Sequence, residues 1–125
     1  APGYFADTMQ VMRTLVGRTA LAFGQRGNTI IGVVATNARL DKEQANKMAQ
    51  MAHDGLARTI RPAHTMLDGD TIFALATGDK PADVNIVGAF AAEAMAQAIL
   101  NATWAAHPVA NLPTASSTAN KTGEA

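Results

Sequence analysis

Two short apolar segments of strand character constrain the fold most strongly, because strands need partners. Residues 30–36 are rich in β-branched side chains without polar alternation, and residues 71–77 have nearly the same character. Such runs are typical of strands covered on both faces, and we expect the first to be central in its sheet. Two strands are too few for a sheet covered on both faces, so further strands must come from elsewhere.

Three helical patterns accompany the two strands. In the middle one, Asp41 and Gln44 have the spacing of a capping box, and Pro62 is expected to stop the helix. Each pattern carries an apolar stripe at spacings of three and four residues. The stripes consist of Phe5, Met9, Met12 and Val16; of Ala45, Met48, Ala49, Ala52, Leu56 and Ile60; and of Val84, Val87, Ala91, Met95, Ile99 and Ala102. The predicted order is helix, strand, helix, strand, helix, which is an α/β fold class.

The composition divides the chain into three parts. Residues 1–28 are predicted to hold a helix and a flexible connector that several glycines loosen. Residues 29–107 contain both strands and the other two helices. Residues 108–125 consist largely of Pro, Ala, Ser, Thr and Asn, which bury too little surface to offset the entropy of ordering. We therefore expect the last part to be a disordered tail.

Charge and cysteine content exclude several classes of function. Ten basic side chains balance ten acidic ones, so the net charge favours neither nucleic acid nor an anionic membrane as a partner. Without cysteine there is no disulfide, no thiolate nucleophile and no zinc site built on sulfur. No stretch reaches the roughly 18 apolar residues of a membrane span, and no signal peptide is visible, so we expect a cytoplasmic setting. The lack of an initiator Met suggests the C-terminal portion of a longer chain.

Thr29 is the candidate nucleophile, since it stands directly after Asn28 at the start of the first strand. If the Asn28–Thr29 bond is cut, one residue carries both the attacking hydroxyl and, in its freed amine, the base that activates it. Asp68 and Asp70 precede the second strand as Thr29 precedes the first. If the strands run side by side in parallel, these residues gather at one end of the sheet, where the carboxylates would orient the ammonium or hydroxyl.

Simpler interpretations compete with this one. Asn-Thr before a strand is an ordinary loop-to-strand transition, and Asp68-Gly69-Asp70 alone would be a plain turn in which Gly69 supplies a positive φ. The three histidines, His64 among them, have no ligand-like spacing, so we assign no metal. The glycines form no phosphate-binding pattern, and we expect no cofactor.

The segment from Gly27 to Gly78 strongly resembles the small β subunit of the L-aminopeptidase/D-esterase family, which includes β-peptidyl aminopeptidases and nylon-oligomer hydrolases. The resemblance lies in the run GNTIIGVVATNARLDKEQANKMAQMAHDGLARTIRPAHTMLDGDTIFALATG. It continues more loosely through the alanine-rich helix and does not extend to the tail. A threonine preceded by asparagine, with two aspartates before the second strand, looks most like the nylon-oligomer hydrolase branch.

The resemblance implies an αββα sandwich of the N-terminal-nucleophile-like type, to which this chain contributes helix, strand, helix, strand, helix. It implies a precursor that cleaves itself between Asn28 and Thr29, with residues 1–28 as the end of the larger α subunit. Thr29 would then be the nucleophile, and Asp68 and Asp70 would be catalytic residues beside it. The α subunit from the same precursor would be a partner, and family members are commonly tetramers or larger.

The implied activity is hydrolysis of an amide bond, either at the N-terminus of short peptides and amides or in linear oligoamides. The other site groups of the family lie upstream, so this segment alone is expected to be inactive. A second interpretation is an acyltransferase resembling the ornithine acetyltransferases, although that family has Ala before its cleavage-site Thr. A third is a non-catalytic, unprocessed fragment.

Overall fold

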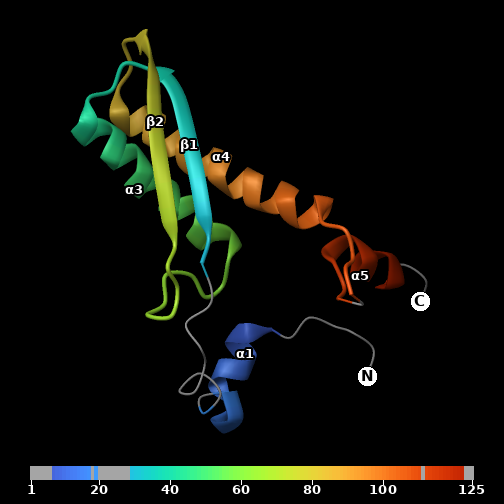
Figure 1. Ribbon diagram of the computed structural model, residues 1–125. Coiled ribbons are helices and arrows are strands. Elements are labelled where there is room, and N and C mark those ends of the chain that lie inside the picture. The colour runs from blue at the N-terminus through green and yellow to red at the C-terminus, as the bar shows by residue number, and fades with distance from the viewer. Residues whose placement is uncertain (1–6, 18, 20–28, 111, 123–125) are drawn as a thin grey trace.

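The computed structural model describes residues 7–17, 19, 29–110 and 112–122 of the 125-residue chain. Its elements follow the predicted order and add one short helix at the end (Figure 1). They are α1 (Thr8–Arg13), β1 (Ile31–Ala38), α3 (Lys42–Thr59), β2 (Thr71–Lys80), α4 (Val84–Ala105) and α5 (Ala115–Thr122). The described residues thus form an α/β structure, as the sequence predicts.

The two strands pair in parallel, which is the arrangement on which the candidate site depends. Ile31 lies opposite Thr71, and the register continues until Thr36 lies opposite Ala76. A shift after Thr36 then pairs Ala38 with Lys80. This irregularity lets β2 continue to Lys80, although the sequence predicts that the strand ends at residue 77.

Helices cover only one face of this sheet. In Figure 1, α3 and α4 lie side by side behind β1 and β2, and both helices contact the strands. On the opposite face, Ile31 is 71% exposed and Phe73 is 57% exposed. Within the described residues one face is therefore uncovered and β1 pairs with β2 alone, so the expected second covering layer and the expected central place of β1 depend on strands outside this segment. The reason is that α3 and α4 pack on the same side, so no described element lies against the other.

The core lies between α3, α4 and the covered face. The predicted capping box is confirmed: Asp41 accepts the Gln44 N–H at 2.8 Å, and the Gln44 side chain accepts the Asp41 N–H at 3.0 Å. Met48 and Leu56 are buried on the predicted stripe of α3. A Cβ at Gly55 would collide with the backbone of α4, so this glycine permits the close approach of the two helices.

Helix α4 begins where Asp83 accepts the Asn85 N–H at 2.7 Å, and it buries Ala91 and Met95 on its predicted stripe. By length and composition alone it is apolar enough to cross a membrane, contrary to the expectation that no stretch of the chain is. This is weak support for a membrane span, because the core helix of a soluble protein passes the same test. It packs on α3 and β1, while only 22% of its apolar window is buried and Phe90 is 70% exposed.

The segment predicted to be a disordered tail contains helix α5. Thr114 explains how this helix begins, because its hydroxyl accepts the Ser117 N–H at 3.3 Å while Ser117 Oγ accepts the Thr114 N–H at 2.9 Å. Helix α5 also contacts α4. At the other end of the chain the predicted stripe is interrupted: Phe5 lies outside the described residues, α1 ends at Arg13, and Val16 lies in a separate helical segment after Thr14, where it is exposed.

Candidate active site

The candidate site lies where β1 and β2 begin. Since the strands are parallel, the segments that precede them meet at the same edge of the sheet, and the Thr71 N–H donates to the Ile30 carbonyl oxygen at 2.9 Å. Thr29 enters this edge from one side, and the loop that contains Asp68 and Asp70 enters from the other. The structure thus brings Thr29, Asp68 and Asp70 to one end of the sheet, as the sequence predicts.

Gly69 provides the space in which the Thr29 hydroxyl lies. A Cβ added to Gly69 would be 2.9 Å from Thr29 Oγ1, closer than real Cβ atoms approach another atom. Gly69 does not have a positive φ, and neither does any other described glycine. The plain-turn interpretation, in which Gly69 supplies a positive φ, is therefore wrong. Glycine leaves the Thr29 hydroxyl in its place, because a Cβ at residue 69 would press on it and shift it.

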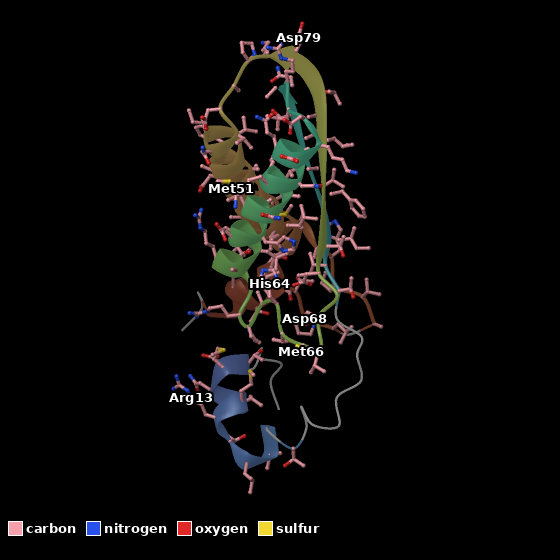
Figure 2. All side chains as sticks on the ribbon, turned by 90° about the vertical axis from the view of Figure 1, so that its left-hand side faces the viewer. Arg13, Met51, His64, Met66, Asp68 and Asp79 are labelled. Carbon is pink, nitrogen blue, oxygen red and sulfur yellow. The ribbon has the colours of Figure 1, made fainter. Side chains whose placement is uncertain are left out.

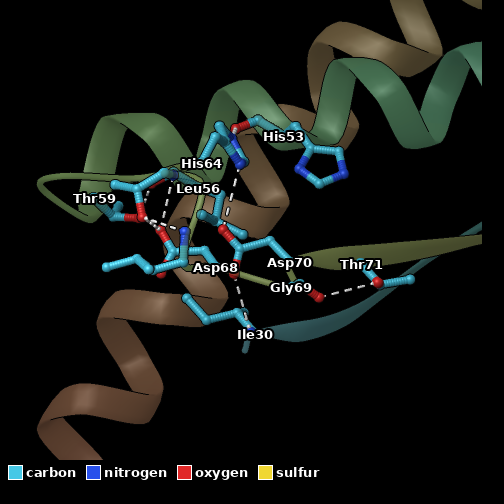
Figure 3. Close-up of polar contacts among 11 residues, drawn as sticks. Ile30, His53, Leu56, Thr59, His64, Asp68, Gly69, Asp70 and Thr71 are labelled. Atoms are coloured by element: carbon cyan, nitrogen blue, oxygen red, sulfur yellow. Dashed lines mark hydrogen bonds and ion pairs between the residues drawn. The ribbon is translucent and has the colours of Figure 1, made fainter. Parts of the chain in front are cut away.

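Asp70 is the carboxylate most closely tied to the start of β1. Its side chain is only 6% exposed, and its Oδ1 accepts the backbone N–H of Ile30 at 3.1 Å (Figure 3). Ile30 directly follows Thr29, so the carboxylate is fixed one residue from the candidate nucleophile. A buried carboxylate is costly unless it is paired, and this one has a polar partner at each oxygen: the Ile30 N–H at Oδ1 and the His64 imidazole at Oδ2.

Asp68 is used differently. Its Oδ2 accepts both the backbone N–H of Thr65 at 2.9 Å and the Thr65 hydroxyl at 2.8 Å. These bonds close the turn that leads into β2. Among the described contacts, no hydrogen bond joins the Thr29 hydroxyl to either aspartate. In this structure Asp68 holds the loop, whereas Asp70 holds the start of β1.

His64 is a site residue that sequence reasoning missed. Its Nδ1 lies 3.3 Å from Asp70 Oδ2, and its ring meets that of His53 edge to face, with ring centroids 4.9 Å apart (Figure 3). The signal in the sequence is weak: His64 lies in the loop that carries Asp68 and Asp70. Its spacing does not reveal the contact, because the loop passes through a left-handed residue at His64 itself, with a φ of 55°.

A pocket of about 430 Å³ borders Thr29. Apolar side chains, including Met12 of α1 and Ile60 and Leu67 of the loop after α3, form part of its wall, and Asp68 and Asp70 line it as well. A mostly apolar cavity with a few convergent polar groups is typical of a small-molecule site. A second pocket, of about 470 Å³ between β1 and α4, has no titratable group in its lining and lies away from this chemistry.

No group of three or more histidines, aspartates or glutamates within the described ranges is arranged to hold a metal ion. What the site offers is a hydroxyl, a buried carboxylate with a partnered imidazole, and an adjoining cavity. The model of peptidase family S58 matches residues 4–115. The chain belongs to peptidase family S58. This confirms the family that the sequence resembles.

Curated relatives of this S58 chain carry two kinds of name. Uncharacterized aminopeptidases of Mycobacterium tuberculosis and Mycobacterium leprae are 49% identical over 108 residues and 51% identical over 102 residues, which cover 74% and 70% of this chain. A 6-aminohexanoate-oligomer endohydrolase of Kocuria sp. is 35% identical over 91 residues, or 62% of the chain. The chain spans 31%, 28% and 26% of the lengths of these three relatives.

Proposed function

We propose that this S58 chain carries the nucleophile of an amide hydrolase, Thr29, which becomes active when the Asn28–Thr29 bond is cut. The observation that carries the proposal is the position of Thr29. Its hydroxyl lies beside Gly69, and the N–H of the next residue, Ile30, donates to the buried Asp70 carboxylate. Asn28 itself lies outside the described residues. The family and the aminopeptidase and endohydrolase names of its relatives support hydrolysis of a peptide or another amide.

Self-cleavage would begin with attack of Thr29 Oγ1 on the carbonyl carbon of Asn28. The C–N bond breaks, the nitrogen of Thr29 leaves as an amine with the hydroxyl proton, and Asn28 is transferred to the oxygen as an ester. Water then hydrolyses this ester, which restores the hydroxyl and gives Asn28 a carboxylate. In the intact chain the nitrogen of Thr29 is an amide and cannot act as a base.

After cleavage, the free amine of Thr29 would take the hydroxyl proton while the hydroxyl attacks a substrate amide. Asp70 would orient and charge-balance this amine, because its carboxylate is already fixed next to the following residue. Asp68 would act beside it by holding the loop through Thr65. The C–N bond of the substrate would break, its amine would leave with the proton held by the Thr29 amine, and the acyl group would pass to Thr29 Oγ1 as an ester that water then hydrolyses.

The substrate class we propose is a short peptide, a small amide or a linear oligoamide. The pocket beside Thr29 supports this class, because it offers an apolar wall to a carbon chain and two carboxylates to a polar or cationic end. The names of the relatives point to the same two alternatives, N-terminal residues and 6-aminohexanoate oligomers.

The proposed assembly is an αββα sandwich in which a second sheet, from the α subunit of the same precursor, covers the open face of β1 and β2. The exposed Ile31 and Phe73 support this, since apolar side chains of a sheet face are normally covered. We further propose a homo-oligomeric protein that acts in the cytoplasm, without a cofactor.

The test compares threonine variants of the full-length protein by mass spectrometry and by hydrolysis of an aminoacyl p-nitroanilide. Thr29→Ala should abolish cleavage and lower hydrolysis by more than about a thousandfold, because the nucleophile is lost. Thr29→Ser should retain both. Thr71→Ala is the matched control, since Thr71 begins β2 and its hydroxyl donates only to the Gly69 carbonyl oxygen at 3.2 Å. Hydrolysis that survives Thr29→Ala would remove the proposal.

An added acyl acceptor separates hydrolysis from acyl transfer in the same assay. If the protein is a hydrolase, release of p-nitroaniline yields a free carboxylate product with or without an added amine such as ornithine. An acylated amine as the main product would instead support the acyltransferase interpretation. No turnover of either kind by processed full-length protein would favour a non-catalytic role.

A further inference from the structure

The buried Asp70 carboxylate has one contact at each oxygen, and only one of these contacts is with the residue that precedes β1. Oδ1 accepts the Ile30 N–H at 3.1 Å, whereas Oδ2 lies 3.3 Å from Nδ1 of His64. The carboxylate is 6% exposed, while the imidazole is 39% exposed and reaches solvent. His64 is therefore placed to determine how Asp70 is oriented, and it does not line the pocket beside Thr29.

The placement of His64 requires an unusual backbone. Its φ of 55° lies in the left-handed region, which residues with a Cβ rarely adopt. In this conformation both ring nitrogens face acceptors, since Nε2 lies 3.5 Å from the carbonyl oxygen of His53 and Nδ1 faces Asp70. The titratable groups that face this ring are Asp70 at the start of β2 and His53 on α3.

We propose that His64 is a positioning residue for the nucleophile. Paired with Oδ2, it keeps Asp70 oriented so that Oδ1 stays on the Ile30 N–H, and it thereby fixes the start of β1, including Thr29. This inference rests on the proposed function of Thr29 for its consequence in catalysis. The contact chain of His64, Asp70 and Ile30 is independent of that function and is tested first.

Hydrogen exchange at the Ile30 amide reports the contact chain directly, because the described structure gives that amide one acceptor, Asp70 Oδ1. The measurement uses full-length protein with Thr29→Ala, so that the chain stays uncleaved and one peptide spans the junction. His64→Gly removes the ring and tolerates the left-handed backbone. It should accelerate exchange of the Ile30 amide by about tenfold, the scale expected for a hydrogen bond to a charged group.

Two further variants separate positioning from a general loss of structure. His64→Asn tolerates a positive φ and keeps a side-chain N–H near the position of Nδ1, so exchange should stay within about twofold of the parent. In a background with Asp70→Asn, His64→Gly should add less than about twofold, since the two residues act through one contact. His107→Gly and His107→Asn, at a histidine that follows α4, are the matched controls and should change nothing.

The same substitutions with Thr29 present then give the functional readout. His64→Gly should slow self-cleavage by about tenfold and His64→Asn should restore most of the rate. Unchanged Ile30 exchange in His64→Gly, or equal effects of Gly and Asn, would overturn the proposal. If the parent protein does not cleave itself, the proposed function of Thr29 fails, while the exchange measurement still decides whether His64 positions Asp70.

Discussion

The two ends of the β1–β2 pair contain the same residue types but are organised differently. Where the strands begin, Asp70 is buried between the Ile30 N–H and His64. Where they end, Asp79 is exposed, and the Thr77 hydroxyl makes one long bond of 3.4 Å to the Thr36 carbonyl oxygen. Figure 2 shows Asp79 at the opposite end of the sheet from His64 and Asp68. Residue types alone therefore do not make the candidate site; burial and convergence distinguish it.

Replacing the aspartate at each end gives the largest expected contrast. Asp70→Asn keeps the shape of the side chain but removes the charge that would orient the Thr29 amine. It should slow self-cleavage and hydrolysis by about 100-fold, the upper range for a hydrogen bond to a charged group. Asp79→Asn should leave both rates unchanged, because Asp79 is exposed at the far end. Mass spectrometry measures self-cleavage, and release of p-nitroaniline measures hydrolysis. Equal rates for the two variants would show that the two ends of the strand pair do not differ in function.

Replacing the glycine at each end separates function from stability. Gly69→Ala places a methyl group against Thr29 Oγ1, and the Thr29 side chain can rotate to move this hydroxyl away. Self-cleavage should therefore slow by about tenfold, while the free energy of unfolding changes little. Gly78→Ala places the same group against the Asn37 backbone, which has no such freedom, and should destabilise the fold by about 2 kcal/mol. Urea unfolding followed beside the cleavage assay tests both. If Gly69→Ala destabilises as much as Gly78→Ala, its role is structural only.

The sequence predicts the positions of the candidate residues better than it predicts their contacts. Parallel pairing is expected of two similar apolar strands that a helix connects, and this pairing places Thr29, Asp68 and Asp70 at one end of the sheet. The contact of His64 with Asp70 depends on one left-handed residue, which has no reliable signature in a non-glycine. The role of Gly69 depends on its contact with Thr29, forty residues earlier in the chain.

The fold shows a similar division between local and non-local information. The capping box of α3 is local, and the structure contains it as predicted. Coverage of the sheet is not local, because apolar strands look the same whether one face or both are covered within the chain. The same limit applies to α5: low hydrophobicity predicts disorder, whereas the reciprocal bonds of Thr114 and Ser117 start a helix.

The smallest expected effect is at the far end of the sheet. Thr77→Val removes a hydroxyl whose bond to the Thr36 carbonyl oxygen is 3.4 Å long and exposed, and valine is well suited to a strand. The free energy of unfolding should change by less than about 0.5 kcal/mol, as for most surface substitutions, and self-cleavage should be unaffected. Urea unfolding and the cleavage assay again supply the measurements. A loss of cleavage in Thr77→Val would mean that the two ends are coupled through the strands, and the site would then extend along the whole β1–β2 pair.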